Sequence, residues 1–353
     1  MNPSVERTLE VRVPTSRNDY QRDLRKERVV EFLAGVEPDP ALFRAPLIQP
    51  DFSVKDLRKA PSRQGTNPKE RNPCARISVM DLVAKERALT EFIGRFQSAI
   101  VAFSGGVDSS YLAYIANQVL GDRARVVTGM SPSVSQRQRD LVKQFVEQYR
   151  LNHYLIDTRE MDNPSYTANP SNRCYFCKSE LFSYLTRLSE EWGVEAVFDG
   201  SNLDDVGDYR PGRQAASEKK IISPFIEVGL RKNDIRELSK NAGLPTWDMP
   251  AMPCLSSRFP YGVEITEEKL RQVDRAETIL REMGFRNFRV RHHETLARIE
   301  IARDEMPGLL DMNLLSVIDS EFKKIGYHYV TLDLQGFRSG SLNELLQLSS
   351  RAE

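Results

Sequence analysis

Short apolar segments alternate with amphipathic helical patterns along the middle of the chain, and this alternation restricts the fold more than any other feature of the sequence. Apolar runs of strand length indicate buried strands, and apolar residues at a spacing of about 3.6 indicate helices. Strands that alternate with helices form a parallel sheet covered by helices on both faces. The sequence therefore predicts a doubly wound α/β domain, with strands at 99–103, 124–128, 153–156 and 196–199 and a shorter strand near Ile221.

The helices predicted for this domain begin near Met80 and continue at 109–120, 135–149, 178–192 and 232–241. From Thr266 the pattern changes to that of a smaller α+β domain, with helices at 266–283 and 314–325 and strands at 288–291, 297–302 and 329–332.

The first 76 residues differ from the rest, because they hold 9 of the 19 prolines and show no sustained helical or strand period. We interpret them as a mostly irregular extension, with short docking segments at 31–33 and 41–47. The predicted organisation is an extension at 1–76, a sheet domain at 77–255 and an α+β domain at 256–353 that serves substrate binding or oligomerisation.

Composition excludes several classes of protein. The chain carries 50 Lys+Arg and 50 Asp+Glu, so it lacks the basic excess typical of proteins that bind nucleic-acid backbones. No apolar run approaches the roughly 20 residues that a membrane-spanning helix needs. The amino terminus shows no basic region followed by an apolar one, so no secretory signal is expected. Four cysteines are too few for a disulfide framework, which favours a reducing, cytoplasmic compartment.

The sharpest local motif is the turn SGGVDSS, which runs from Ser104 to Ser110 between a predicted buried strand and a predicted helix. Two glycines allow a ligand to approach the backbone closely, and the N–H groups at a helix start bind phosphate. Asp108 offers oxygen ligands for Mg²⁺. The lysine of the Walker motif is missing, so this is not a P-loop of that type. The alternative is a strand–helix turn with an N-cap serine and no ligand.

Three cysteines accompany this turn. Cys174 and Cys177 form a CxxC at a predicted helix start, and Cys254 follows much later in the chain, while Cys74 belongs to the extension. A CxxC alone fits a redox pair, half of a zinc site or the corner of an iron–sulfur cluster. Three thiolates without an obvious fourth ligand suit a [4Fe–4S] cluster with one open iron. Two buried cysteines with an unrelated third remain the alternative.

The turn SGGVDSS resembles the pyrophosphate loop of the N-type ATP pyrophosphatases, the PP-loop enzymes with an adenine nucleotide alpha hydrolase-like fold. In that family the loop grips the β,γ-pyrophosphate of ATP while a substrate oxygen attacks the α-phosphorus and forms an adenylate. The resemblance implies ATP-binding roles, with Mg²⁺ at Asp108, for Ser104, Gly105, Gly106, Asp108, Ser109 and Ser110.

A narrower resemblance rests on several blocks further along the chain: CLSSRFPYG at 254–262, DYRPG at 208–212, RVR at 289–291, ARIE at 297–300 and YVTLDLQGFRSG at 329–340. Together they resemble the LarE family, ATP-dependent sulfur transferases of nickel-pincer nucleotide cofactor biosynthesis. The resemblance spans roughly residues 80 to 345. It implies that carboxylates of pyridinium-3,5-biscarboxylic acid mononucleotide become thiocarboxylates.

Two sulfur chemistries occur in that family. In one, a single cysteine attacks the adenylate and gives up its sulfur, which leaves dehydroalanine. In the other, three cysteines hold a [4Fe–4S] cluster that delivers sulfide from its open iron. Cys174, Cys177 and Cys254 resemble the second type, although Cys254 also suits the sacrificed thiol.

The resemblance and the negative charges of the expected substrate together indicate which other residues would form the binding site. Arginine forks bind carboxylate and phosphate oxygens in pairs. The resemblance implies substrate-binding roles for residues in the matched blocks, namely Ser257, Arg258, Arg289, Arg291, Glu300 and Arg338. Arg289 and Arg291 would share one face of a strand, and their alternative is a solvated face paired with Glu300. Lys178 is assigned either to ATP phosphate or to an ordinary helix surface, and Glu277 either to the reacting substrate or to the surface. Asp208 and Arg210 form a loop ion pair or approach the nucleotide.

The sequence thus predicts a cytoplasmic ATP-dependent sulfurtransferase, an adenylate-forming enzyme that acts on a small nucleotide and assembles as a homo-oligomer, with no membrane and no nucleic-acid partner. A tRNA-thiolating enzyme of the same superfamily is the first alternative, and the neutral net charge argues against it. A non-catalytic nucleotide-binding module with a structural zinc is the second. An ammonia-using amide synthetase is weaker, because it gives the three cysteines no task.

Overall fold

A computed structural model describes Val11–Arg12, residues 73–206 and residues 211–338. Side chains are described for residues 82–206 and 211–338. The chain divides into two compact units, one formed by Met1–Val13 and Asp81–Glu353 and the other by Pro14–Met80. Most of the predicted extension, including its two docking segments, lies outside the described residues. Residues 208 and 210 of the DYRPG block lie outside them as well. Within the described ranges, no helix combines the length and the apolar character that crossing a membrane requires.

The strands of the main sheet follow the order β1 (Val11–Arg12), β4 (His153–Asp157), β3 (Ala124–Met130), β2 (Ala99–Ala102) and β5 (Ala196–Phe198). The four strands β2 to β5 of the main sheet are parallel, as predicted. Among these described strands, only β1, which the sequence pattern did not indicate, runs antiparallel, and it lies at the edge. In the centre, Ala99 lies in register with Ala124 on one side and with Ala196 on the other. The strand predicted near Ile221 is reduced to a single bridge between Phe198 and Ile222.

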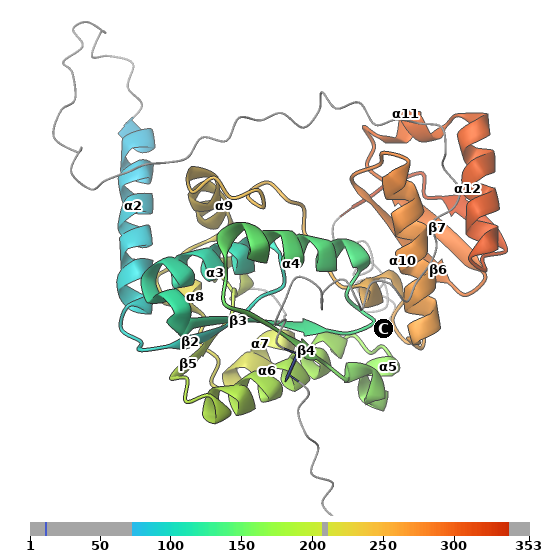
Figure 1. The fold of residues 1–353 in the computed structure, drawn as a ribbon. Coiled ribbons are helices and arrows are strands. Elements are labelled where there is room, and N and C mark those ends of the chain that lie inside the picture. Colours follow the sequence, from blue (N-terminus) through green and yellow to red (C-terminus); the bar gives the residue numbers. More distant parts are fainter. Residues whose placement is uncertain (1–10, 13–72, 207–210, 339–353) are drawn as a thin grey trace, which may run out of the picture. The chain divides into compact units, whose positions relative to one another are not determined.

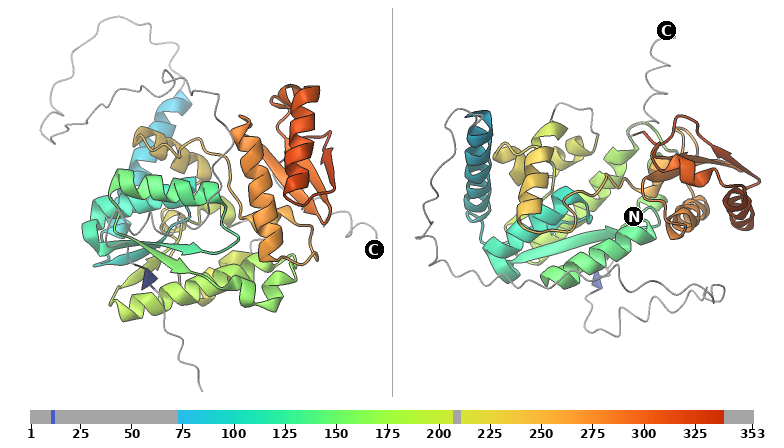
Figure 2. Two further views of the ribbon diagram at one scale, coloured as in Figure 1. Left: turned by 45° about the vertical axis from the view of Figure 1, so that its right-hand side comes forward. Right: turned by 90° about the horizontal axis from the view of Figure 1, so that it is seen from above.

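Helices cover both faces of this sheet (Figures 1 and 2). One face packs Val101 and Val126 against α3 (Val107–Leu120), α4 (Gln136–Tyr149), α8 (Pro224–Glu227) and α9 (Lys232–Asn241). The other face packs Ile100 and Val127 against α6 (Arg173–Glu191) and α7 (Pro211–Glu218). Successive strand residues point to opposite faces, which explains why both Val101 and Ile100 are fully buried. The strands are apolar at consecutive positions because helices cover both faces of the sheet.

Several elements differ from the predicted bounds. Helix α2 (Pro73–Ile93) begins before Met80, inside the segment predicted to be irregular, because proline is well tolerated in the first turn of a helix. Helix α6 begins at Arg173 rather than Lys178, so the CxxC lies in its first turns. The short elements η3 (Gly121–Arg123), η4 (Glu160–Asp162), α5 (Pro164–Thr167), η5 (Leu203–Asp205) and η6 (Leu255–Arg258) were not predicted.

The carboxyl-terminal part is α+β, as predicted. It contains α10 (Glu267–Glu282), β6 (Phe288–His293), β7 (Leu296–Ile301), α11 (Met306–Leu309), α12 (Met312–Lys324) and β8 (Tyr329–Leu332). The three strands lie in the order β6-β7-β8, antiparallel between β6 and β7 and parallel between β7 and β8. Residues such as Phe322 and Ile301 form a separate apolar core. A domain boundary at 255/256 stays a prediction.

The strand order places the functional edge of the sheet. The chain moves from β2 outward through β3 and β4, and then returns to the other side of β2 to form β5. Ligands of open α/β sheets bind at the carboxyl ends of the strands, at the point where the order reverses. Here that point lies between β2 and β5, where Ser104 and Asp199 follow the two strands.

A pair of matched substitutions tests the described core. Leu112 on α3 is fully buried, whereas Leu334 is 83% exposed. We expect Leu112→Ala to lower the free energy of unfolding by about 2–5 kcal/mol, because it removes packing and leaves a cavity. Leu334→Ala should stay within about 0.5 kcal/mol of the parent chain. Urea unfolding measures both, and equal effects of the two substitutions would contradict the assignment of α3 to the core.

Candidate functional site

The glycine turn has the backbone shape that a ligand loop needs. Gly105 has a φ of 76°, and a Cβ there would lie 3.0 Å from Cγ2 of Val142. A side chain at this position would therefore be strained and crowded. Gly106 is the N-cap of α3 and no side chain caps the helix. The sequence alternative of an N-cap serine is therefore wrong, since the first-turn N–H groups have neither intrahelical acceptors nor a serine cap.

The serines of the turn hold it in shape. Ser109 Oγ donates to the carbonyl of Gly106 at 3.2 Å, accepts from the backbone N–H of Ser104 at 3.2 Å and lies 3.1 Å from Ser104 Oγ. From α4, Gln138 Nε2 donates to the carbonyl of Ser104 at 2.8 Å. Ser110 is fully buried and its hydroxyl has no partner among the described residues. These contacts fix the loop and leave the helix amides as an anion site.

Asp108 is a half-satisfied carboxylate in the first turn of α3. Its Oδ2 lies 2.5 Å from Nζ of Lys232, whereas its Oδ1 is buried and has no partner among the described residues. Burial raises the pKa of Asp108, and the nearby Lys232 opposes that effect. Mg²⁺ commonly binds through one or two carboxylates together with substrate phosphates. The orphaned oxygen therefore fits the Mg²⁺ role that the sequence predicted.

The segment after β5 completes this edge, and sequence reasoning missed it. The carboxylate of Asp199 accepts from the hydroxyls of Ser201 and Ser223, each at 2.6 Å. A Cβ on Gly200 would lie 3.1 Å from the backbone nitrogen of Ser109. The end of β5 thus packs directly on the start of α3. The sequence did carry a signal for this segment, because it follows a predicted strand and the carboxyl ends of parallel strands lie at the same edge of a sheet.

The two cysteine segments lie against each other. Arg173, only 6% exposed, donates to the carbonyl of Ser256 at 2.8 Å and also binds the side-chain oxygen of Asn169. The hydroxyls of Tyr166 and Ser256 lie 2.6 Å apart. Arg173 precedes Cys174, and Ser256 follows Cys254 by two positions. Neither Arg173 nor Tyr166 was among the predicted site residues.

The three thiols influence one another electrostatically. Cys174 is exposed, and Cys177 and Cys254 are partly buried. Enough protein surrounds Cys174 for desolvation to raise its pKa, and Cys254 raises it further. Burial raises the pKa of Cys177 well above its ordinary value, with additional contributions from Glu160, Cys254 and Cys174. The gathering of all three cysteines at one site stays a prediction.

The cysteines lie at the same edge of the sheet as the glycine turn. The backbone N–H of Leu255 donates to the carbonyl of Ser133 at 2.9 Å, and Ser133 lies in the loop after β3. The hydroxyl of Ser133 in turn donates to the buried Glu160 at 3.0 Å. The segment of Cys254 is thus tied to the carboxyl ends of the strands.

The three cysteines have the ligand atoms that a [4Fe–4S] cluster needs, but not the arrangement. Across residues 82–206 and 211–338, no three His, Cys, Asp or Glu side chains are arranged so that they could hold a metal ion. The thiols supply the right atoms, but their described geometry does not fit a cluster. The cluster therefore stays a prediction from the sequence.

Two predicted substrate residues form a buried ion pair. Nε and Nη2 of Arg258 each lie 2.8 Å from an oxygen of Glu277, and both side chains are about 5% exposed or less. Nη1 of Arg258 donates to the carbonyls of Pro253 and Cys254 and to Ser257 Oγ. Burial opposes ionisation of Glu277, but Arg258 outweighs it and holds the pKa below its usual value. The surface alternative for Glu277 is therefore wrong, and the pair supports the loop of Cys254.

A second buried pair joins Arg291 to Glu300. Nη2 of Arg291 lies 2.8 Å from Glu300 Oε2, and its Nη1 donates to the carbonyl of Ser257 at 2.8 Å. Arg298 binds the other oxygen of Glu300 at 3.1 Å. The solvated-face alternative is therefore wrong for Arg291 and Glu300, which are 5% and 0% exposed.

Arg289 differs from the other predicted clamps. It donates to backbone carbonyls, those of Phe288 at 2.6 Å and Ala251 at 2.7 Å, and its guanidinium lies over the ring of Phe337. Burial and the neighbouring cation Arg258 lower its pKa to about 10. A cation crowded by other cations favours an anionic ligand, so Arg289 is the predicted residue best suited to bind substrate.

The last predicted residues lie apart from these pairs. The ammonium of Lys178 lies over the ring of Phe182 at 5.7 Å, and a Cβ on Gly212 would strike its side chain. Arg338 donates to the carbonyl of Gly336 at 3.2 Å. Asp208 and Arg210 lie outside the described residues. The roles of Lys178 and Arg338 stay predictions.

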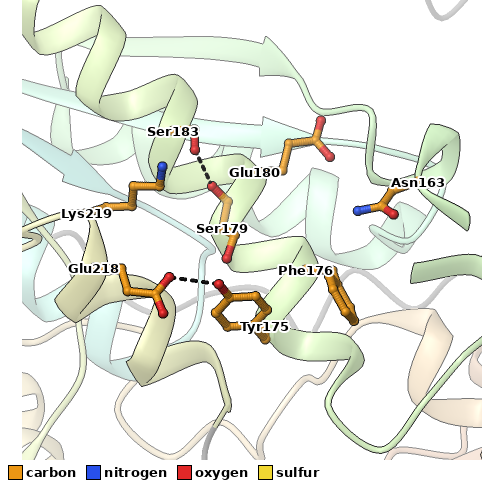
Figure 3. A pocket seen from close by; sticks show the side chains of 8 residues that line it. All are labelled: Asn163, Tyr175, Phe176, Ser179, Glu180, Ser183, Glu218 and Lys219. Atoms are coloured by element: carbon orange, nitrogen blue, oxygen red, sulfur yellow. Dashed lines mark hydrogen bonds between the residues drawn. The ribbon is translucent and has the colours of Figure 1, made fainter. Parts of the chain in front are cut away.

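A groove of ≈ 330 Å³ lies beside α6 and α7, and Figure 3 shows its lining side chains. Tyr175 and Phe176, the two residues inside the CxxC, line it, and the hydroxyl of Tyr175 donates to Glu218 at 2.8 Å. None of the lining residues belongs to the glycine turn or to the predicted site, so this groove is not the candidate ATP site.

The Arg258–Glu277 pair gives a testable consequence. We expect Glu277→Gln to lower the free energy of unfolding at neutral pH by about 3–5 kcal/mol, because Arg258 is left as an unpaired buried charge. The pKa of Glu277 is lower in the folded chain than in the unfolded chain. Its stabilisation is therefore present above the unfolded pKa of about 4.3 and is lost as the pH falls through the folded pKa.

Chemical denaturation from neutral pH down to about pH 2 measures this effect, since the stabilisation is lost only below the ordinary carboxyl pKa. The difference between parent chain and variant should shrink toward acid. Glu282→Gln, which removes an exposed carboxylate from the same helix, is the control. A difference that does not change with pH would argue against the ion pair.

Comparisons with known proteins agree on the family. The sequence profile of the NAD synthase family matches residues 86–173, which include the glycine turn. An uncharacterized protein of Synechocystis sp. is 46% identical over 75% of this chain and 99% of its own length. Pyridinium-3,5-bisthiocarboxylic acid mononucleotide synthase of Lactiplantibacillus plantarum is 34% identical over 75% of this chain and 96% of that enzyme. An uncharacterized protein of Methanocaldococcus jannaschii is 31% identical over 68% of this chain and 90% of its own length.

Each of these relatives aligns over nearly all of its own length, so the likeness extends well beyond the glycine turn. The chain therefore belongs to the LarE-type family of pyridinium-3,5-bisthiocarboxylic acid mononucleotide synthases, within the PP-loop ATP pyrophosphatases.

Proposed function

We propose that the chain is an ATP-dependent sulfurtransferase. It adenylates a carboxylate of pyridinium-3,5-biscarboxylic acid mononucleotide and replaces AMP with sulfur to give a thiocarboxylate. The observation that carries the proposal is the meeting of an uncapped helix start and the two cysteine segments at one edge of the sheet. The name of the Lactiplantibacillus plantarum relative supports the choice of substrate.

The first step forms the adenylate. A carboxylate oxygen of the substrate attacks the α-phosphorus of ATP, the bond from that phosphorus to the bridging oxygen breaks, and pyrophosphate leaves. A carboxylate is already ionised at neutral pH, so no side-chain base is needed. The first-turn amides of α3 stabilise the negative charge on the leaving pyrophosphate. Bound Mg²⁺ would neutralise phosphate charge next to Asp108.

The second step transfers sulfur. A sulfur nucleophile attacks the acyl carbon of the adenylate, and AMP leaves with the bonding electrons. If Cys254 is the nucleophile, it loses its thiol proton and forms a thioester. Removal of its Cα proton then breaks the Cβ–S bond, which releases the thiocarboxylate and leaves dehydroalanine. Arg258 fixes the loop for this attack, because it binds the carbonyls of Pro253 and Cys254.

The three-cysteine pattern of the sequence predicts a [4Fe–4S] cluster held by Cys174, Cys177 and Cys254, which would supply sulfide, but the described geometry of these donors does not fit one. Either route requires Cys254. The two routes differ in what happens to this residue, because the sacrificial route removes its sulfur and the cluster route does not. This difference is measurable.

Cys254→Ser separates the two steps. We expect the variant to release pyrophosphate from ATP in the presence of the dicarboxylate nucleotide at a rate of the same order as the parent chain, because the anion site of α3 is unchanged. Thiocarboxylate formation should fall below detection, because oxygen replaces the required sulfur. Pyrophosphate is measured by a coupled assay and the product by mass spectrometry.

Cys74→Ser is the matched control, since Cys74 lies outside the blocks that resemble the family. It should leave both steps unchanged. Thiocarboxylate formed at the parental rate by Cys254→Ser would sink the proposed sulfur site. Absence of pyrophosphate release by the parent chain would sink the proposed function itself.

The source of the sulfur is tested on anaerobically reconstituted protein. The three-cysteine pattern predicts iron and acid-labile sulfide in the protein and an intact Cys254 after several turnovers. Loss of the mass of H₂S from the peptide that contains Cys254 would instead establish sacrifice. Zinc without iron or acid-labile sulfide would favour a structural metal at the CxxC.

A further inference from the structure

One buried arginine joins the two cysteine segments. Arg173 lies in the first turn of α6, directly before Cys174, and is almost fully buried. Its Nη1 donates to the carbonyl of Ser256 at 2.8 Å, two positions after Cys254. The same Nη1 also binds Oδ1 of Asn169, in the segment that leads into α6. A single guanidinium nitrogen therefore contacts both the approach to α6 and the loop of Cys254.

The later part of that loop is held without this arginine. Asn169 is fully buried, and its Nδ2 donates to the carbonyl of Pro260 at 2.7 Å. The backbone N–H of Gly262 donates to the carbonyl of Asn169 at 2.9 Å. These bonds use the amide and the backbone of Asn169, so they do not require Arg173. Loss of the arginine should therefore loosen mainly the part of the loop that carries Cys254.

The other anchors of residues 254–258 come from elements other than α6. The backbone N–H of Leu255 binds the loop after β3, and Arg258 is itself part of the Cys254 loop. Tyr166 reaches the same residues from α5. Among the hydrogen bonds described for residues 82–206 and 211–338, the bond from Arg173 is the one that joins α6 directly to residues 254–258.

Arg173 also interacts electrostatically with the thiols of both segments. Its described hydrogen-bond acceptors are an amide oxygen and a backbone carbonyl, and neither of them is charged. Burial lowers the pKa of Arg173, but Cys254 and Cys174 outweigh burial and hold the pKa above its ordinary value. The guanidinium therefore lies where it contacts one segment through hydrogen bonds and acts on the sulfur atoms of both.

We propose that Arg173 is a positioning residue for sulfur transfer, which holds the loop of Cys254 against the start of α6. The inference rests on the proposed function and deepens it. The attacking sulfur must meet the acyl carbon of the adenylate, and a misplacement of about 1 Å can slow such a step about 100-fold. Formation of the adenylate should not depend on Arg173, because the proposed site of that step is the start of α3.

Arg173→Met tests the inference on the full chain. The first turnover should release pyrophosphate at a rate of the same order as in the parent chain. The thiocarboxylate formed per pyrophosphate should fall about 100-fold. Adenylate that sulfur does not capture is hydrolysed, because water attacks the acyl carbon and AMP leaves. Arg173→Lys should recover part of the loss, since it keeps the charge without the planar fork. Rapid-quench sampling with mass spectrometry measures both products.

A cross-link measures the position of the loop without any turnover. In the Cys74→Ser background, a short bismaleimide joins Cys174 either to Cys177 within α6 or to Cys254 across the two segments. Each maleimide adds to one thiol, so no oxidant is needed. On reduced, metal-free protein, we expect Arg173→Met to lower the yield of the cross-link to Cys254 several-fold. The cross-link within α6 should keep its parental yield. Mass spectrometry of the peptides distinguishes the two.

Arg187→Met is the matched control, since it removes an exposed arginine of the same helix whose ion pair with Glu191 stays within α6. It should leave the product ratio and both cross-links unchanged. A parental product ratio or a parental cross-link to Cys254 in Arg173→Met would overturn the inference. Equal loss of pyrophosphate release and of thiocarboxylate would overturn it as well, because that pattern indicates general damage to the fold.

If Arg173→Met does not fold, as judged by its melting temperature, Arg173→Lys decides in its place. A product ratio and a cross-link yield below the parental values would then support the inference, and parental values of either would overturn it. In all these cases the parent chain still releases pyrophosphate, so the proposed function stands. A parent chain that releases none would instead refute that function, and the cross-link would still report on the position of the loop.

Discussion

The unpaired amides at the start of α3 are the constraint on which the rest of the site depends. A helix that begins at a glycine without a side-chain cap leaves its first N–H groups in need of acceptors. The turn that creates this start is itself fixed by Ser109 and Gln138, and by the end of β5 at Gly200. The start of α3 therefore presents unpaired N–H donors at a fixed place, next to the end of β5.

The arginines near Cys254 divide into two classes that composition alone does not distinguish. Arg258 and Arg291 are buried and paired with Glu277 and Glu300, so their charges are largely compensated inside the fold. Arg289 binds backbone carbonyls and is crowded by cations. The buried pairs therefore hold the surroundings of Cys254, and a substrate-binding role for Arg289 stays a prediction.

Local pattern predicted most of the fold, because strand and helix periods are written in consecutive residues. The parallel sheet, α9 at its predicted bounds and the α+β part follow directly from those periods. The pattern failed where tertiary contact decides: Ile221 forms no strand, and α6 starts five residues before the predicted position. Within the site, the motifs located the glycine turn and the cysteines. They could not reveal Lys232 or Arg173, since Asp108 and Ser256, to which these residues bind, lie far away in the sequence. The segment at Asp199 did have a sequence signal, because it ends a predicted strand.

The loop of Cys254 is anchored through its main chain. Arg258 binds the carbonyl oxygens of Pro253 and Cys254, Leu255 binds Ser133, and Arg173 binds Ser256. None of these contacts uses the sulfur atom. Oxidation, metallation or removal of that atom would leave the anchoring bonds intact, so a spent or modified residue 254 would still occupy the same position. Such a scaffold is suited to regeneration in place, and equally to a single use after which the protein persists folded but inert.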